Sequence, residues 1–197
     1  MAISEELQRL NLISGDRISE VFDDKYSDIL DYVFATPSSF IEEMWSRYTN
    51  GQASLNGSVF EGLIACLLYR MGVLPIYLQA KLAFVPNVDF DFVLYAEEFG
   101  PIVLSAKTSL RERYKQADLE GMMLRQVHRR SKSYLITLNS AEAIRVRRKV
   151  GSGEVLGLDD VILATSCEFD ELITELMGYT YIVPPQVDVI SSSKVIT

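Results

Sequence analysis

The stretch that decides the fold is VDFDFVLYAEEFGPIVLSAK, residues 88–107. Its first part alternates polar and apolar side chains and then becomes fully apolar, which predicts a strand over residues 88–95 that enters a core. Residues 96–101 contain a Gly-Pro pair typical of a turn, and residues 102–107 form a second apolar run. We therefore expect a β-hairpin whose second strand ends at Lys107.

Helical and strand-like segments flank this hairpin. Before it the chain is mostly amphipathic, and an apolar helix is expected from Asn56 to about Met71. The later segments that we expect are a long helix at 109–130, strands at 134–138 and 161–165, helices at 140–149 and 168–178, and a tail at 179–197 with an edge strand. This order predicts an α/β fold, in which a mixed central β-sheet is flanked by helices and preceded by a helical N-terminal region.

Composition excludes several classes of protein. The chain has 197 residues, of which 48% are hydrophobic and 23% charged, so it is a globular domain with a sizeable core and not a disordered or collagen-like chain. Two cysteines are too few for a disulfide framework. No signal peptide is visible, and Arg70 and Pro75 interrupt the most apolar stretch, so we expect a cytoplasmic protein without a membrane partner. The expected organisation is a helical region at 1–50, a core at 51–180 and a tail at 181–197, within a single domain.

Charge is distributed unevenly along the chain. The net charge of −8 argues against a uniformly basic nucleic-acid binder. Residues 107–149, however, contain twelve basic and four acidic residues, a net charge of +8, which leaves −16 for the remainder. A local basic face is sufficient for contacts to DNA phosphates. The alternative interpretation is a solvated helix face that pairs with the acidic part of the chain.

Carboxylates and a lysine coincide at the ends of the predicted hairpin strands. Asp89 and Asp91 are two residues apart, and Ser105 precedes Lys107 by two, so each pair is expected on one face of its strand. Carboxylates can hold Mg²⁺ beside a scissile phosphate, and a nearby lysine can stabilise developing negative charge. Asp91 is the preferred metal ligand because an apolar run follows it into the core, whereas Asp89 can also be interpreted as a solvent-facing residue.

With these residues the sequence resembles the PD-(D/E)xK nuclease superfamily, in the branch whose strand reads S-x-K, here Ser105 to Lys107. In that branch a glutamate thirteen residues after the lysine supplies the missing carboxylate, and Glu120 stands at this position. Glu61 matches the upstream helix glutamate that completes such sites. The resemblance covers residues 56–138 and implies a restriction-endonuclease-like fold. It implies these roles: Asp91 and Glu120 as metal ligands, Glu61 as a further catalytic carboxylate, and Lys107 as the group that assists the attacking water.

A second motif lies between the lysine and Glu120. Arg111, Glu112 and Arg113 are similar to the R-(D/E)-R element with which the CCGG-family (EcoRII-like) Type II restriction endonucleases read C·G pairs. An arginine can pair with guanine, and a glutamate can accept from cytosine N4. The resemblance implies a Mg²⁺-dependent enzyme that acts as a homodimer and cuts double-stranded DNA at a C/G-rich palindromic site.

Several of these residues also have a purely structural interpretation. Ser109 to Glu112 fits a capping box, in which Glu112 would only close the start of a helix. Glu120 fits an exposed helix carboxylate, and Glu61 fits a position favoured by the helix dipole. For the protein as a whole, the alternatives are a catalytically inactive DNA-binding or partner subunit on the same fold, and a nuclease that acts on DNA junctions or damaged DNA.

Overall fold

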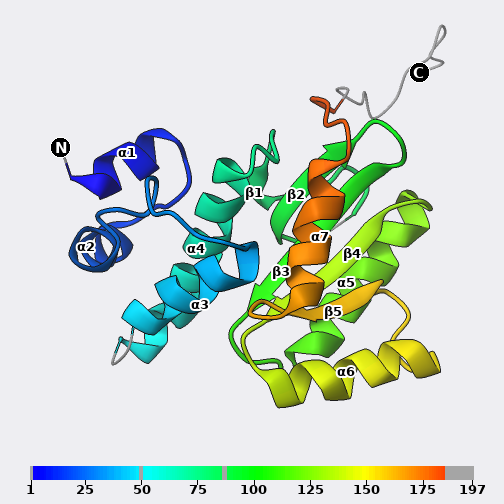
Figure 1. Ribbon diagram of the computed structural model, residues 1–197. Coiled ribbons are helices and arrows are strands. Elements are labelled where there is room, and N and C mark those ends of the chain that lie inside the picture. Colours follow the sequence, from blue (N-terminus) through cyan, green and yellow to red (C-terminus); the bar gives the residue numbers. More distant parts are fainter. Residues whose placement is uncertain (1, 49–50, 86–87, 185–197) are drawn as a thin grey trace, which may run out of the picture.

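The structure of the protein is a computed structural model that describes residues 2–48, 51–85 and 88–184. A central sheet carries helices on both faces, and a group of helices lies at one side of it (Figure 1). The helical elements are α1 (Ile3–Arg9), α2 (Asp16–Lys25), α3 (Pro37–Arg47), the 3₁₀ turn η1 (Ala53–Leu55), α4 (Asn56–Arg70), α5 (Arg113–Val127), α6 (Ser140–Ser152) and α7 (Cys167–Met177). No helix in these ranges is long and apolar enough to cross a membrane.

Within the described residues, five strands form one mixed sheet in the order β1-β2-β3-β4-β5. The strands are β1 (Tyr77–Ala80), β2 (Phe90–Ala96), β3 (Gly100–Lys107), β4 (Lys132–Thr137) and β5 (Asp160–Leu163). β2 pairs antiparallel with β1 and β3, whereas β3, β4 and β5 run parallel. The predicted hairpin and the predicted mixed α/β sheet are therefore confirmed. Because the three parallel strands end at one edge, the residues that follow them gather there, as is common for binding sites of α/β folds.

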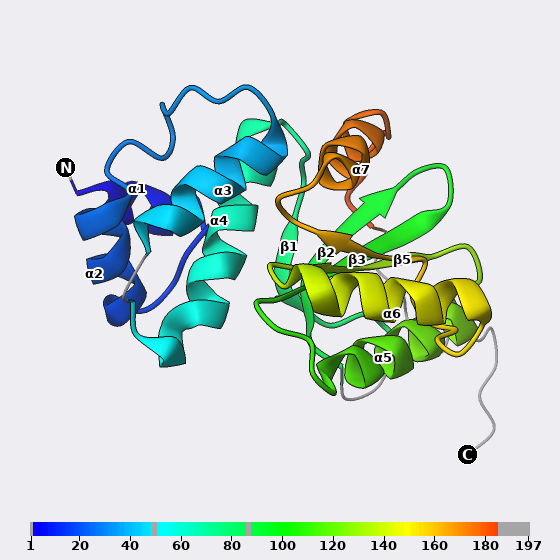
Figure 2. The same ribbon diagram turned by 60° about the horizontal axis from the view of Figure 1, so that its bottom comes forward.

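Helices cover the two faces of the sheet differently. Figure 2 shows α7 on one side and α5 and α6 on the other. The first face packs Phe92, Leu104 and Ile136 into the main core with α4 and α7. The second face packs Leu135 and Val161 against α5 and α6. Both faces of the central strands are thus buried, which explains why these strands are nearly continuous apolar runs in the sequence.

The N-terminal helices pack around α4 and not on the sheet itself. Gly62 of α4 allows this approach, because a Cβ at that position would lie 2.7 Å from the ring of Phe22 in α2. A second link joins α3 to α7, where Asp170 accepts from the backbone N–H of Ser38 at 2.6 Å and from its hydroxyl at 2.9 Å. The proposed division into a region at 1–50, a core at 51–180 and a tail at 181–197 stays a prediction.

The structure differs from the sequence-based expectation at three places. β1 was not expected; it is only four residues long and lacks an apolar alternation. The helix expected at 109–130 begins at Arg113, because residues 108–112 form a loop in which Arg111 has φ 38°, outside the helical region. In the tail, Tyr181 forms one antiparallel bridge with Ala96. The rest of the expected tail, from residue 185, lies outside the described residues.

Candidate active site and nucleic-acid interface

The β2–β3 hairpin places Asp91 beside Lys107. Lys107 Nζ donates to Asp91 Oδ2 at 2.6 Å, and the backbone N–H of Ala106 donates to the same oxygen at 2.9 Å. The Asp91 side chain is only 10% exposed and that of Lys107 is 24% exposed. Both contacts fall on Oδ2, so no described residue hydrogen-bonds to Oδ1. One oxygen of a nearly buried carboxylate is therefore free to meet a ligand.

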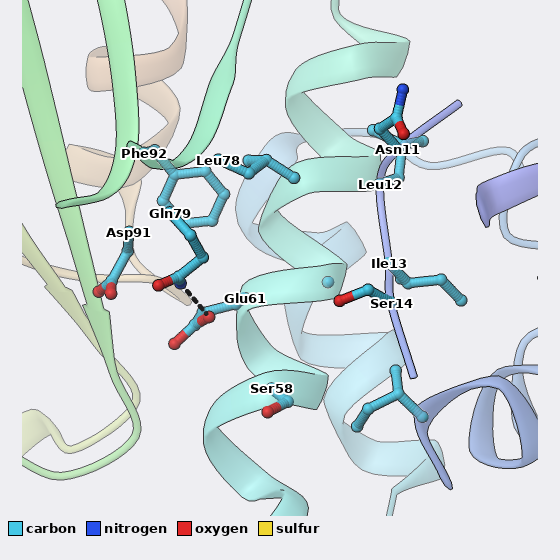
Figure 3. Close-up of a pocket in the computed structure, with 12 residues that line it drawn as sticks. Asn11, Leu12, Ile13, Ser14, Ser58, Glu61, Leu78, Gln79, Asp91 and Phe92 are labelled. Carbon is cyan, nitrogen blue, oxygen red and sulfur yellow. Dashed lines mark hydrogen bonds between the residues drawn. The ribbon is translucent and has the colours of Figure 1, made fainter. Parts of the chain in front are cut away.

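Glu61 approaches the same place from α4. Figure 3 shows Glu61 and Asp91 among the residues that line one cavity of about 640 Å³, between the sheet and the loop after α1. Burial, and then the negative charge of Asp91, raise the pKa of Glu61 to about 7, while Lys107 acts in the opposite direction. A half-buried carboxyl group whose charge is disfavoured by a neighbouring carboxylate, with a lysine next to them, forms a site suited to a cation or a phosphate.

Gln79 is a site residue that sequence reasoning missed. Its side-chain amide donates to Glu61 Oε2 at 3.0 Å (Figure 3). Its φ is 46°, in the left-handed region that a non-glycine residue rarely adopts. The β1–β2 ladder pairs Leu78 with Phe92 and Ala80 with Phe90 but skips Gln79 and Asp91 between them. The ladder is therefore interrupted where the two side chains enter the site. No sequence pattern indicates this, because β1 itself was not recognisable.

Glu120 contributes from α5. Its carboxylate accepts from the Gln116 side chain at 2.7 Å. Burial raises the pKa of Glu120, and both Lys107 and Asp91 act on it electrostatically. This environment differs from that of an isolated, exposed helix carboxylate. The structure thus brings Asp91, Lys107, Glu61 and Glu120 into one electrostatic group.

The donor set fits a magnesium ion in its chemistry. In the part of the chain that the structure describes, no three His, Cys, Asp or Glu side chains form a metal-binding group. Mg²⁺ prefers oxygen ligands, keeps several waters, and is commonly held by one or two carboxylates together with phosphate oxygens of the substrate. Asp91, with its free oxygen, and Glu120 are the carboxylates that would hold such an ion.

Two secondary candidates have different environments. Asp89 lies before β2, is exposed, and forms an ion pair with Lys81 at 3.5 Å. The expectation that it shares a strand face with Asp91 is therefore wrong, and the solvent-facing interpretation of Asp89 holds. Ser105 is buried within β3, where it lies opposite Leu135 of β4.

Arg111, Glu112 and Arg113 lie at the carboxyl end of β3, directly after Lys107, and all three are exposed. Glu112 is the N-cap residue of α5 but makes no side-chain capping bond. Its carboxylate contacts Lys115 instead, and this ammonium group lowers the pKa of Glu112. The capping-box interpretation is therefore wrong. The two arginines form no ion pair with any described residue.

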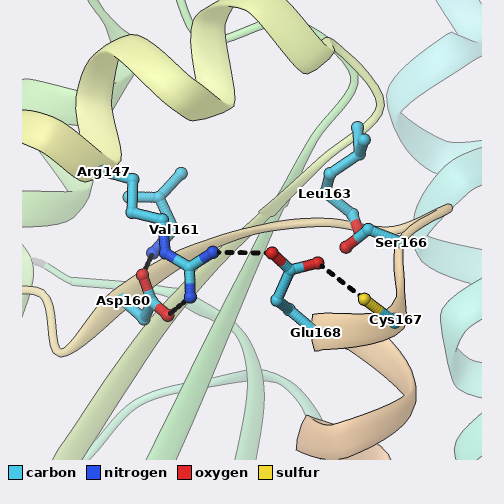
Figure 4. Close-up of polar contacts among 7 residues, drawn as sticks. All are labelled: Arg147, Asp160, Val161, Leu163, Ser166, Cys167 and Glu168. Carbon is cyan, nitrogen blue, oxygen red and sulfur yellow. Dashed lines mark hydrogen bonds and ion pairs between the residues drawn. The ribbon is translucent and has the colours of Figure 1, made fainter.

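Only part of the basic segment is free to bind an anion. Arg147 illustrates the paired part, because it bridges Asp160 at 2.7 Å and Glu168 at 3.0 Å (Figure 4). Within the described ranges, half of its twelve basic residues are in ion pairs: Lys107, Lys115, Arg125, Lys132, Arg147 and Lys149. The six without one are Arg111, Arg113, Arg129, Arg130, Arg145 and Arg148. Arg111 and Arg113 flank Glu112 in the sequence, and Arg145 acts electrostatically on Glu112.

Comparison with known proteins bears on the fold. No family model matches the chain, and no curated protein matches it in sequence. Among solved structures, the fold is similar to that of the restriction endonuclease PspGI in complex with its substrate DNA. The TM-score is 0.56 and the identity 16%, over 80% of this chain and 78% of the other. The protein therefore has the restriction-endonuclease-like α/β fold that the hairpin and its flanking segments predicted.

Proposed function

We propose that the protein is a Mg²⁺-dependent endonuclease that hydrolyses phosphodiester bonds of double-stranded DNA, in the manner of a Type II restriction enzyme. The observation that carries this proposal is the Asp91–Lys107 contact of 2.6 Å, at the edge where the parallel strands end. Glu61 and Glu120 lie within the electrostatic influence of this pair. A carboxylate with a free oxygen, a lysine and two further carboxyl groups are the parts that phosphodiester hydrolysis requires.

Each residue then has a distinct role. Asp91 and Glu120 would hold Mg²⁺, which polarises the scissile phosphate and lowers the pKa of a bound water when present. The Lys107 ammonium group lies where it can orient the attacking water and stabilise negative charge that develops on the phosphate. Glu61, whose pKa of about 7 allows it to exchange a proton near neutrality, would accept a proton from that water.

The exposed arginines support DNA as the substrate. Arg111 lies in the loop after Lys107 and Arg113 is the first residue of α5, so a duplex whose phosphate lies at Lys107 would present its bases to them. Arginine pairs with guanine and Glu112 can accept from cytosine N4, which favours a C/G-rich site. A two-fold homodimer would place two such sites on the two strands of a palindrome. The similarity to PspGI, solved with its substrate DNA, supports the same class of substrate.

The test is digestion of unmethylated phage or plasmid DNA. We expect discrete fragments with Mg²⁺, none with EDTA, and none with the Lys107→Ala variant. Lys81→Ala is the matched control, because Lys81 is also a lysine paired with an aspartate but lies exposed outside the site. Equal cleavage by wild type and Lys107→Ala would refute the proposed function.

Two observations favour the second candidate, an inactive DNA-binding or partner subunit. Lys107 and Asp91 already neutralise each other, and the described residues offer no group of three metal ligands. Such a protein would bind DNA in a salt-dependent way without cutting it at any Mg²⁺ concentration. Preferential cutting of branched over linear DNA would instead indicate a junction nuclease.

A further inference from the structure

Glu142 has an unusual position for an acidic residue. It lies in the first turn of α6, whose other charged residues are all basic. Its carboxylate nevertheless forms no ion pair with any described residue. It accepts from two backbone N–H groups instead, that of Leu110 at 2.6 Å and that of Arg111 at 3.2 Å, more than thirty positions earlier in the chain.

The loop that Glu142 contacts combines a strained residue with a buried anchor, and the N–H of Arg113 donates to the carbonyl of Leu110 at 2.5 Å. Arg111 has φ 38°, a left-handed conformation that is unfavourable for an arginine. Glu112 provides no side-chain cap for α5. Leu110 is fully buried and anchors the loop in the core between β4, α5 and α6. A strained backbone conformation persists only where its surroundings hold it, and the Glu142 carboxylate bonds to the N–H of the strained residue and to that of the residue before it.

Glu142 is itself held in place. Its backbone N–H donates to Asn139 Oδ1 at 3.0 Å, which is the N-cap bond of α6. The carboxylate is thus fixed at the start of a helix, where the helix dipole also stabilises its negative charge. Because the carboxylate oxygens contact backbone amides, Glu142 forms no ion pair with Arg111 or Arg113 among the described residues.

We propose that Glu142 is a positioning residue for DNA recognition: its bonds to the backbone of Leu110 and Arg111 hold the 108–112 loop so that Arg111 and Arg113 meet the base edges in one orientation. This inference rests on the proposed function. Recognition of a base by an arginine requires two aligned hydrogen bonds, so it depends on a fixed backbone. A preformed loop also avoids the ordering cost that a flexible one meets on binding.

Amide hydrogen exchange tests the first half of the inference without DNA. In Glu142→Gln and Glu142→Ala, the amides of Leu110 and Arg111 should exchange faster than in wild type by about tenfold or more, because hydrogen bonds to a charged acceptor are lost. Asp118→Asn is the matched control. Asp118 also accepts from two backbone N–H groups, those of Leu156 and Gly157, but in a different loop. It should leave the exchange of the 108–112 loop unchanged.

Cleavage kinetics test the second half. Digestion of phage DNA identifies the preferred site, and rates are then compared with sites that differ by one base pair. Glu142→Gln should lower this discrimination by about tenfold, with a higher KM and an unchanged kcat at the preferred site, since the groups around Lys107 are intact. Asp118→Asn should retain the wild-type ratio.

The outcomes separate the two proposals. Unchanged exchange at Leu110 and Arg111 in both Glu142 variants overturns the inference. Faster exchange together with an unchanged discrimination ratio also overturns it. An equal loss of kcat at every site overturns it as well, because that result would indicate only a structural role for Glu142. If the wild type neither binds nor cuts DNA, the proposed function fails and the recognition role fails with it, while exchange still decides whether Glu142 holds the loop.

Discussion

Replacing Lys107 by methionine tests whether the Asp91–Lys107 contact also stabilises the fold. The change removes the ammonium group but keeps an unbranched side chain of similar length. Asp91 would then retain a single donor, the backbone N–H of Ala106, for a carboxylate that is only 10% exposed. Removing one partner of a buried pair leaves an uncompensated charge. We therefore expect the variant to be less stable than the wild type.

The exposure of the pair sets the magnitude. Loss of one partner from a fully buried pair lowers the free energy of unfolding by about 3–5 kcal/mol, and a bond to a charged group contributes about 1.5–3 kcal/mol. Because the Lys107 side chain is 24% exposed, water can partly replace it. We expect a loss of about 2 kcal/mol at 25 °C, or about 4–8 °C in Tm for a chain of this size. Urea unfolding with EDTA, followed by circular dichroism, measures this loss.

Two further variants make the reasoning refutable. The D91N/K107M double variant carries no uncompensated charge, so its stability should return to within about 1 kcal/mol of wild type. Lys81→Met removes an exposed ion pair and should change stability by less than about 0.5 kcal/mol. If Lys107→Met is as stable as the wild type, or if the double variant is no better than the single one, the contact does not have the assigned energetic role.

Three other predictions concern packing, pH dependence and recognition. Gly121→Ala should lower the free energy of unfolding by about 1–3 kcal/mol, because the new Cβ would lie 2.3 Å from a backbone oxygen of the loop before β5. Gly57→Ala is the control and should not be destabilised, because no atom lies within 4 Å of the position of its Cβ. Equal effects of the two variants in urea unfolding would contradict this packing. Glu61 has a pKa raised to about 7 from a usual value of 4.5, so without metal its ionisation should reduce stability progressively between about pH 4.5 and pH 7. Glu61→Gln should therefore be more stable than wild type by about 2 kcal/mol at pH 8 and not at pH 4, and a constant difference across this range would refute the assignment. Arg113→Ala should weaken DNA binding and relax the preference at one base pair by about 1–3 kcal/mol, measured by fluorescence anisotropy with single-base variants, whereas a uniform loss across all sequences would indicate a phosphate contact.

The hairpin and the parallel strands could be predicted because local patterns encode them. The run from 88 to 107 contains two strands and a Gly-Pro turn. The next strands of the sheet, β4 and β5, correspond to short apolar runs that are typical of buried strands. The hairpin pattern also predicts that Asp91 and Lys107 are neighbours, because antiparallel pairing brings the start of one strand next to the end of the other. The further carboxylates, Glu61 and Glu120, were expected from the resemblance to the PD-(D/E)xK nucleases, and both lie within the electrostatic influence of this pair.

The remaining features depend on contacts between distant segments. Gln79 reaches Glu61 only because β1 joins the edge of the sheet, and a four-residue strand has no recognisable pattern. The start of α5 was misplaced because its local sequence fits a capping box, whereas Glu142 bonds to the loop from another helix and stabilises a non-helical conformation at Arg111. The local sequence favours a helix start at Ser109, but a tertiary contact from Glu142 accompanies a loop there. Such disagreement between local propensity and tertiary structure is common at functional segments, and this is the segment that we assign to recognition.

The net charge of residues 107–149 is also an incomplete guide to the protein surface. A net charge of +8 over residues 107–149 overstates the surface that can meet DNA, because half of the basic residues there pair with acidic groups, most of which lie outside the segment. The solvated-face interpretation therefore holds for those residues. Arg111, Arg113 and Arg145 form no ion pair within the described part of the chain and are exposed, and Arg111 and Arg113 follow the strand that ends at Lys107. Free positive charge that follows Lys107 in the chain is a better basis for phosphate binding than the total, because a basic group in an ion pair must give up its partner before it can neutralise a phosphate.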